Sequence, residues 1–207
     1  MKLIEWALKA HHIVFGGLYL YGQARTIIVA LNKQGNQRTK TLNSNKERET
    51  TYRYDRVAHY YEHRPGYDPK FFRKILTYAS PGANLNELIV ADIGSGNGSS
   101  RKALINAGCD PRKIFEVEPN GSMRELSAKA GGIHIKAGTA TNTGLPDGQS
   151  DVIIFCNSIH QATTNKMDID KIKLEINRIA RSNGKVIFVA QRFDPKDKII
   201  QALHEHC

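Results

Sequence analysis

Short apolar runs and longer amphipathic segments alternate along most of the chain. The runs of strand length are ELIVADI (87–93), KIFEVEP (113–119), IHIKAG (133–138), DVIIFCNS (151–158) and GKVIFVAQRF (184–193). Runs of this length between turn residues are typical of strands, and the Val-Ile-Ile-Phe core of the fourth run is expected to be buried on both faces. Strands that alternate with helices predict an α/β fold with a doubly wound, Rossmann-like, mostly parallel sheet.

The segments between the runs have apolar residues at three- and four-residue steps, as in helices with one buried face. In the last of them Ile169, Ile172, Ile176 and Ile179 follow this spacing. A short helix is also expected before the turn at 64–66. Ser99 and Ser100 are predicted to cap the helix that begins at residue 99. The predicted helices cover 69–79, 99–108, 120–132, 168–184 and 197–207.

The first 50 residues have a different pattern. An apolar, aromatic stretch leads into the polar segment NKQGNQRTKTLNSNKERET (32–50). The longest run without charge or histidine, Ile13–Ala24, is too short to span a bilayer. We therefore predict an N-terminal extension with a polar linker at 1–50, one domain at 51–207, and no membrane insertion.

Composition narrows the function classes only slightly. The net charge is +10 and the pI is about 9.6, but the basic residues are spread out and form no dense stripe of the kind that binds nucleic acid. Cys109, Cys156 and Cys207 lack the spacing of metal ligands, so no metal site is predicted. Scattered cysteines of odd number fit reduced thiols and a cytoplasmic location.

The segment Asp92-Ile93-Gly94-Ser95-Gly96-Asn97-Gly98 directly follows the first predicted strand. Glycines here allow positive φ and a close approach of a ligand to the backbone. The spacing is GxGxG, which is neither the dinucleotide-binding GxGxxG nor a phosphate-binding P-loop with its lysine. Glu118 ends the second strand about 20 residues later, where a carboxylate can accept both hydroxyls of a ribose. Taken alone, Glu118 also fits a solvated acid at a strand end.

Five segments in order resemble class I S-adenosylmethionine-dependent methyltransferases. Four are VADIGSGNGSS, FEVEPNGSM, AGTATNTGLPDGQSDVIIFCNSIHQ and EINRIARSNGKVIFVA, and the lead-in YDRVAHYYEHRPGYDP is similar to the small-molecule branch of trans-aconitate and ubiquinone/menaquinone enzymes, methyltransferase type 11. The resemblance covers about residues 52–195. It implies S-adenosyl-L-methionine as cofactor and a methyltransferase that acts on a small-molecule acceptor.

The resemblance also implies roles for single residues. Asp92 would anchor the methionyl end of the donor, and Glu118 would take its ribose hydroxyls. His160 is the candidate general base at the mouth of the methyl donor, where imidazole titrates near neutral pH. The implied cofactor-binding residues are Asp92, Gly94, Ser95, Gly96, Glu118, Pro119, Thr139, Ala140, Asn157, Tyr61 and Arg64.

Simpler readings of three of these residues stay open. Asp92 could hydrogen-bond the turn that follows it, as aspartates in turns often do. His160 could be an ordinary histidine at the end of a loop. Arg64 either pairs with the methionine carboxylate of the donor through two parallel hydrogen bonds or only marks a turn with Pro65.

In the family that this chain resembles, two more strands follow the fifth and form an antiparallel hairpin. The sequence ends within the helix after the fifth strand, so the last two strands of the seven-stranded fold are expected to be absent. An open sheet edge would result, which a homo-oligomer or a partner chain would cover. Two alternatives to a small-molecule enzyme therefore remain: a weak or inactive S-adenosylmethionine-binding domain that works through a partner, and an RNA methyltransferase.

Overall fold

The computed structural model describes residues 13–14, 19–21, 24–27, 30–32, 54–55, 58–63, 65–162 and 166–192. The predicted linker at 33–50, Arg64 and the helix expected at 197–207 lie outside these residues. Within the described part of the chain, no helix has both the length and the apolar character needed to cross a bilayer.

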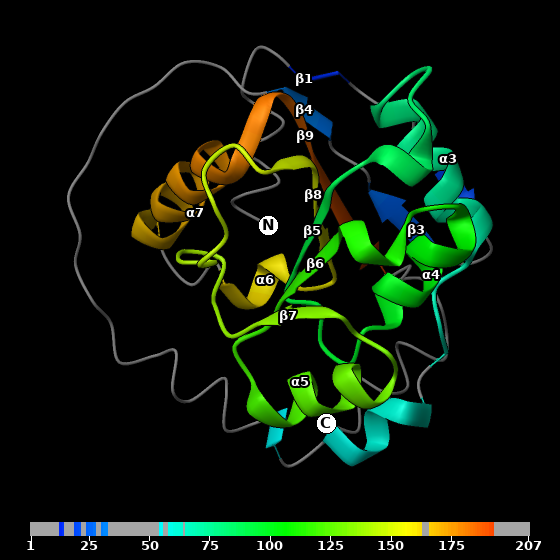
Figure 1. Ribbon diagram of the computed structural model, residues 1–207, viewed down its shortest axis with the longest axis vertical. Helices are drawn as coiled ribbons and strands as arrows, with labels where there is room; N and C mark the ends of the chain where they lie inside the picture. Colours follow the sequence, from blue (N-terminus) through cyan, green and yellow to red (C-terminus); the bar gives the residue numbers. More distant parts are fainter. Residues whose placement is uncertain are drawn as a thin grey trace.

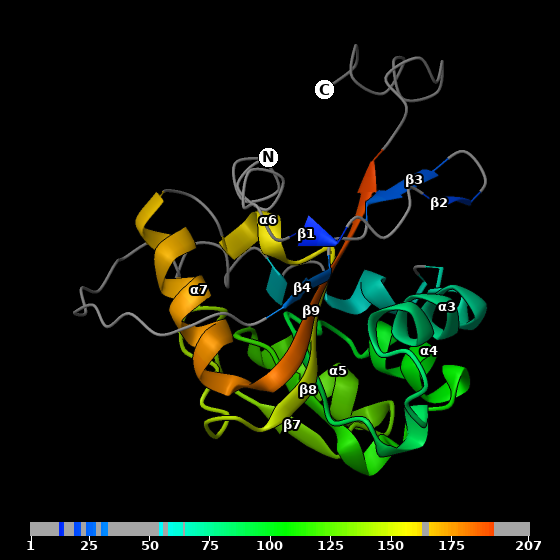
Figure 2. The ribbon, with the colours of Figure 1, turned by 90° about the horizontal axis from the view of Figure 1, so that it is seen from above.

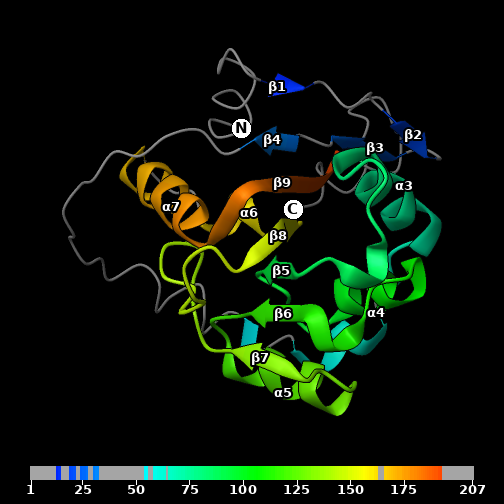
Figure 3. The same cartoon turned by 45° about the horizontal axis from the view of Figure 1, so that its top comes forward.

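Five parallel strands form the centre of the sheet, as the alternating pattern predicts. They are β5 (Val90–Ile93), β6 (Ile114–Val117), β7 (His134–Lys136), β8 (Ser150–Cys156) and β9 (Ala180–Arg192). Their spatial order is β9-β8-β5-β6-β7, and every neighbouring pair is parallel (Figure 3). The order reverses beside β5, because β6 and β7 follow on one side of it and β8 and β9 on the other. This reversal between β5 and β8 is where ligands bind in such sheets.

Helices cover both faces of this sheet. The helices α3 (Pro69–Ala79) and α4 (Ser99–Ala107) pack on one face, and α7 (Lys166–Ile179) packs on the other (Figure 1). Alternate residues of β8 divide between the two cores: Val152 and Ile154 face α3 and α4, whereas Ile153 and Phe155 face α7. Burial on both faces explains why the sequence of β8 is continuously apolar.

The remaining helical elements are short. Helix α5 (Gly121–Lys129) follows β6, and α6 (Ile159–Ala162) follows β8. Three 3₁₀ turns are also present among the described residues: η1 (Ala58–His63), η2 (Leu85–Glu87) and η3 (Pro111–Lys113). Helix α3 has the predicted bounds because Asp68 accepts a hydrogen bond from the Lys70 amide and Pro69 occupies the first turn.

The prediction that Ser99 and Ser100 cap α4 is wrong. The residue at the N-cap is Gly98, with φ of 79° and no capping side chain. The Ser100 hydroxyl donates instead to Asp92 Oδ2 at 2.5 Å, and the Ser99 hydroxyl donates to Asn97 Oδ1 at 2.7 Å. Both hydroxyls therefore hydrogen-bond to neighbouring side chains, Asp92 and Asn97, and not to the amides of the first helical turn.

The outer edge of β9 is paired, in contrast to the open edge that the sequence predicts. Strands β3 (Ala24–Ile27) and β4 (Ala30–Asn32) both run antiparallel to β9, at its end and at its middle respectively. Strand β1 (Ile13–Val14) pairs with β4, and β2 (Tyr19–Tyr21) pairs with β3 (Figure 2). The antiparallel pair β4–β1 thus occupies the place where the resemblance puts two C-terminal strands.

Candidate functional site

The glycine loop, residues 94–98, crosses the carboxyl end of the sheet beside the point where the strand order reverses. Its backbone is fixed by β6, since the amides of Gly94 and Ser95 both donate to the Val117 carbonyl, at 2.7 and 3.3 Å. A third bond, from the Gly98 amide to the Ser95 carbonyl at 3.1 Å, closes the loop into the start of α4. The loop is therefore a preformed turn that is tied to the neighbouring strand.

The three loop glycines serve different purposes, although all have positive φ. A Cβ on Gly94 would lie 2.4 Å from Ser158 Cβ, and a Cβ on Gly98 would lie 2.5 Å from Ser127 Oγ. At these two positions the backbone packs directly against other side chains of the protein, so no other molecule can approach it there. A Cβ on Gly96 would meet nothing within 4 Å, so the backbone of Gly96 is the part of the loop that another molecule can approach.

Glu118 lies directly beside Gly96. Its Oε2 accepts from the Gly96 amide at 2.9 Å, and its Oε1 accepts from the Asn120 amide at 2.9 Å. Burial of the side chain raises the pKa of Glu118, while these two amide hydrogen bonds lower it. Each carboxylate oxygen keeps acceptor capacity beyond its one amide bond, because a carboxylate can accept about four hydrogen bonds.

Asp92 lies beneath the loop and not on its surface. It is fully buried on the α4 side of β5, where Oδ2 accepts from the Ser100 hydroxyl. Burial raises the pKa of Asp92 to about 7, and the bond from Ser100 opposes this shift. Its Oδ1 and the buried hydroxyl of Ser95 both lack a hydrogen-bond partner. Buried polar atoms without a partner are uncommon and call for an explanation.

A second buried carboxylate supports the loop from below. Glu116 pairs with Arg101 of α4 at 3.0 Å, and both side chains are buried. Ser127 of α5 donates to Glu116 Oε1 at 2.6 Å, and Arg101 donates to the Ala130 carbonyl at 2.9 Å. This cluster packs against Gly98 and joins α4, β6 and α5 under the loop.

The segment before α3 lies against the carboxyl end of the sheet. The Tyr61 carbonyl accepts from Asn97 Nδ2 at 3.1 Å, so this predicted residue contacts the glycine loop through its backbone. Asp55 Oδ1 accepts from Asn120 Nδ2 at 2.8 Å and from the Ser122 hydroxyl at 2.9 Å.

Next to Asp55 at the start of the same segment, the Tyr54 hydroxyl accepts from Gln161 of α6, and the ring of Tyr54 packs edge-on against Tyr61. Burial raises the pKa of Tyr54 to about 12, so this hydroxyl stays protonated at neutral pH. We call the described residues 54–55 and 58–63 the lead-in strap.

Asn157 has a left-handed backbone conformation, which is uncommon for residues other than glycine although asparagine adopts it more readily than most. Its φ is 53°, and among the described residues it is the non-glycine residue with positive φ. The amide donates to the Val189 carbonyl at 2.8 Å, and Nδ2 donates to the Tyr67 hydroxyl at 3.2 Å. Such strain persists where surrounding contacts hold it, often at functional sites. His160 follows in α6, where the structure describes its backbone.

Pro119, Thr139 and Ala140 lie next to Glu118 or after the adjacent strand. Pro119 is exposed, and Arg124 donates to its carbonyl at 2.7 Å and to that of Glu118 at 2.9 Å. Thr139 begins the segment after β7, and its hydroxyl lies 3.0 Å from that of Thr141. Ala140 is buried.

The structure thus brings the predicted residues of β5, β6 and β7 to one edge of the sheet. Several contacts around the site, and along the segment that leads from β7 to the start of β8, were not predicted from the sequence, since they come from elements distant in the chain. They involve Asp55, Tyr54, Ser158, Gln161, and Glu175 with Arg178 of α7. The pattern Glu175-x-x-Arg178 on a predicted helix was the one available signal, because side chains three apart can pair. Among the described residues, no three His, Cys, Asp or Glu side chains are grouped to hold a metal ion.

Comparison with known proteins agrees with this architecture. Residues 91–188, just under half of the chain, match the family described as "Methyltransferase domain". No curated protein matches the sequence. A candidate methyltransferase from an antibiotic biosynthesis pathway of Anabaena variabilis is 27% identical, with a TM-score of 0.44, over 56% of this chain and 43% of its own.

Two further structures have the same fold. One, from Methanococcus maripaludis, is a candidate S-adenosyl-L-methionine-dependent methyltransferase with 19% identity and a TM-score of 0.50, covering 72% of this chain and 66% of its own. The other, from Anaeromyxobacter dehalogenans, is a candidate type II methyltransferase with 23% identity and a TM-score of 0.51, covering 69% and 57%. The chain therefore spans less than half of the first structure and about two thirds or less of the other two.

Proposed function

We propose that this protein, of which residues 91–188 match the family described as "Methyltransferase domain", binds S-adenosyl-L-methionine and transfers its methyl group to a small-molecule acceptor. One observation carries the donor assignment. The Glu118 carboxylate lies at the end of β6 and is held by the Gly96 amide, at the one loop glycine whose Cβ position faces open space. A carboxylate beside accessible backbone is suited to a ribose whose two hydroxyls need acceptors.

The unpaired buried atoms support the same ligand. Asp92 Oδ1 and Ser95 Oγ lie under and within the loop and have no partner. The methionyl part of S-adenosyl-L-methionine carries an ammonium group. This group can donate the hydrogen bond that Asp92 Oδ1 does not receive from the protein. Asp92 and Ser95 would therefore hold that end, either directly or through a water molecule, while Glu118 holds the ribose.

The donor itself supplies the difficult chemistry, since its sulfonium makes the methyl group electrophilic. What this chain supplies is alignment in a site that the lead-in strap shields from water. His160 is proposed as the general base for an acceptor that must lose a proton, because α6 follows the strand end nearest to the loop. Asn157, through its constrained backbone, would fix the start of that segment.

The small-molecule acceptor rests on the similarity of the lead-in to that branch of the family. An RNA acceptor is the second candidate, and the charge of +10 is the observation that favours it. The buried thiols Cys109 and Cys156 are free, which fits the proposed cytoplasmic location.

Calorimetric titration with S-adenosylhomocysteine tests the donor site, with NAD and ATP as control ligands. Glu118→Gln keeps the size of the side chain but turns an amide group toward one of the two donor amides. We expect the affinity to fall about 10- to 100-fold, the cost of losing hydrogen bonds to a charged group. Glu125→Gln, on the exposed side of α5, is the matched control and should bind as the natural chain does.

Binding that Glu118→Gln leaves unchanged, or equal binding of NAD, would contradict the donor assignment. Once binding is established, transfer of labelled methyl groups to a fraction of small metabolites or to RNA separates the two acceptor classes. Salt sensitivity of the RNA reaction would support the second class.

A further inference from the structure

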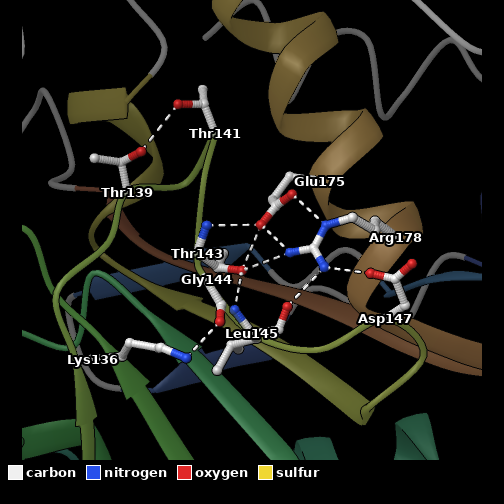
Figure 4. A network of polar contacts seen from close by, with 9 residues as sticks. All are labelled: Lys136, Thr139, Thr141, Thr143, Gly144, Leu145, Asp147, Glu175 and Arg178. Atoms are coloured by element: carbon white, nitrogen blue, oxygen red, sulfur yellow. Dashed lines mark hydrogen bonds and ion pairs between the residues drawn. The ribbon is translucent and has the colours of Figure 1, made fainter.

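The segment that joins β7 to β8 contains Thr139 and Ala140 near its start, and it is supported from another element of the chain. A pair of backbone hydrogen bonds between Thr139 and Asn142, at 2.9 and 3.2 Å, closes a turn at its start. After this turn the polar contacts of the segment go to α7 and to Lys136, whose Nζ donates to the Gly144 carbonyl at 2.6 Å (Figure 4). The position of the turn therefore depends on groups outside it.

Glu175 is the centre of these contacts. The Thr143 amide and hydroxyl both donate to Glu175 Oε1, at 2.7 and 2.5 Å (Figure 4). Arg178 holds the same carboxylate with two parallel hydrogen bonds, from Nε to Oε2 at 2.9 Å and from Nη2 to Oε1 at 2.7 Å. Burial would raise the pKa of Glu175, but the bonds from Arg178 and Thr143 outweigh it and lower that pKa, so the carboxylate is charged at neutral pH.

Arg178 extends the same support along the segment. Its Nη1 donates to the Leu145 carbonyl at 2.7 Å and pairs with Asp147 at 2.6 Å. Its own carbonyl accepts from the Gly148 amide at 2.8 Å. One side of α7 thereby sets the path of residues 143–148.

The supported segment also lies against the strand that holds the glycine loop. A Cβ on Gly138 would be 2.7 Å from the Thr143 carbonyl oxygen and 2.9 Å from Val117 Cγ1. The Val117 carbonyl is the acceptor for the Gly94 amide. A shift of Thr143 is therefore transmitted to the ends of β6 and β7, where there is no free space to absorb it.

If the proposed function is correct, the contacts that Glu175 and Arg178 make with residues 143–148 also affect ligand binding, because β6 lies between β5 and β7. With the ribose at Glu118 and the methionyl end over the glycine loop of β5, the base has the end of β7 on its other side. We infer that Glu175 is a positioning residue that fixes Thr139 and Ala140 for recognition of the base, and so determines discrimination between bases.

The test compares S-adenosylhomocysteine with S-inosylhomocysteine, which has a carbonyl oxygen in place of the adenine amino group. Dissociation constants are measured by calorimetry for the natural chain, for Glu175→Gln, and for Asp170→Asn. The last variant removes an exposed ion pair with Lys173 on the same helix and is the matched control. Amide hydrogen exchange at residues 139–148 is followed in all three proteins without ligand.

We expect the natural chain to prefer the adenine compound and Glu175→Gln to lose about three- to tenfold of that preference, the value of roughly one hydrogen bond. Exchange at 139–148 should accelerate in this variant and remain unchanged in Asp170→Asn. An equal loss of affinity for both ligands would indicate a purely structural role and overturn the inference, as would an unchanged ratio. A natural chain that binds neither ligand would refute the donor assignment and base recognition together, while the exchange result would still decide whether Glu175 holds the segment.

Discussion

The carboxyl end of the inner strands and the outer edge of β9 are built in different ways. At the glycine loop, side chains close to strand ends hold backbone amides, as Glu118 holds Gly96. At the outer edge, backbone pairs with backbone, and β9 is joined to β3 and β4 from the beginning of the chain. The first arrangement needs particular residues, whereas the second needs extended chain in register. Substitutions at the loop should therefore change binding, and substitutions at the edge should change association.

The largest effect is expected from a methyl group added to the loop. Gly94→Ala places a Cβ 2.4 Å from Ser158 Cβ at a φ of 72°, so it combines overpacking with backbone strain and should cost about 2–4 kcal/mol of unfolding free energy. Gly96→Ala has only the strain of its positive φ and should cost about 1–2 kcal/mol. Urea denaturation measures both costs.

The effect on ligand affinity should be the reverse of the effect on stability, with the larger loss of affinity in Gly96→Ala. Gly96→Ala points its methyl group into the space that the donor is proposed to use, so it should weaken S-adenosylhomocysteine binding more than its small cost in stability suggests. Equal stability of the two variants would contradict the division of the loop into a sealed and an accessible glycine.

Asp92 gives the glycine loop a dependence on pH. Burial raises its pKa in the fold to about 7, well above the ordinary value for an aspartate, so the folded protein binds a proton that the unfolded chain has released. The contribution of Asp92 to stability is therefore full below about pH 4 and is lost as the pH rises toward 7, by up to a few kcal/mol. Burial raises the pKa of Glu116 and Glu118 as well and adds slope of the same sign.

Asp92→Asn removes one of these titrations. The unfolding free energy of the variant should fall less steeply between pH 4 and pH 7 than that of the natural chain. The slope that remains is the balance of Glu116 and Glu118, whose raised pKa values lower stability as the pH rises, and Glu175, whose lowered pKa acts in the opposite direction. Urea denaturation at a series of pH values gives both slopes. Parallel curves would show that Asp92 does not titrate in this range.

The same contrast explains what could be predicted from the sequence. The order of strands and helices, and the place of Glu118 beside the loop, follow from local periodicity and from a separation of about 20 residues. The pairing of β4 with β9 joins residues 30–32 to 185–187, and no local pattern reports such a contact. The roles of Ser99 and Ser100 were mistaken because both positions fit a cap, and the competing acceptors Asn97 and Asp92 are identified only by geometry.

Breaking the outer edge should have a smaller effect, and one of another kind. Consecutive prolines at Ala30 and Leu31 remove one amide directed to each side of β4, so pairing with β9 is lost whichever way each amide points. The exposed edge should cause association that depends on concentration, measured by light scattering. S-adenosylhomocysteine affinity should change less than about threefold, because the donor site depends on side chains of β5, β6 and β7 and the edge contributes none of them. A large loss of affinity in a monomeric variant would show that the two regions are coupled.

The smallest effect concerns the lead-in strap. Asp55→Ala removes the acceptor for Asn120 Nδ2 and for the Ser122 hydroxyl, while Asn120 keeps its amide bond to Glu118. Because Asp55 is exposed, the two bonds should be worth about 1 kcal/mol together, and S-adenosylhomocysteine should dissociate about two- to fivefold faster in stopped-flow measurements. Asp55→Asn retains one acceptor oxygen, so its dissociation rate should lie between those of the natural chain and Asp55→Ala. Glu87→Gln, which breaks an exposed ion pair with Lys113, should leave the rate unchanged. If Asp55→Ala slowed dissociation, the strap would hinder the bound donor and not retain it.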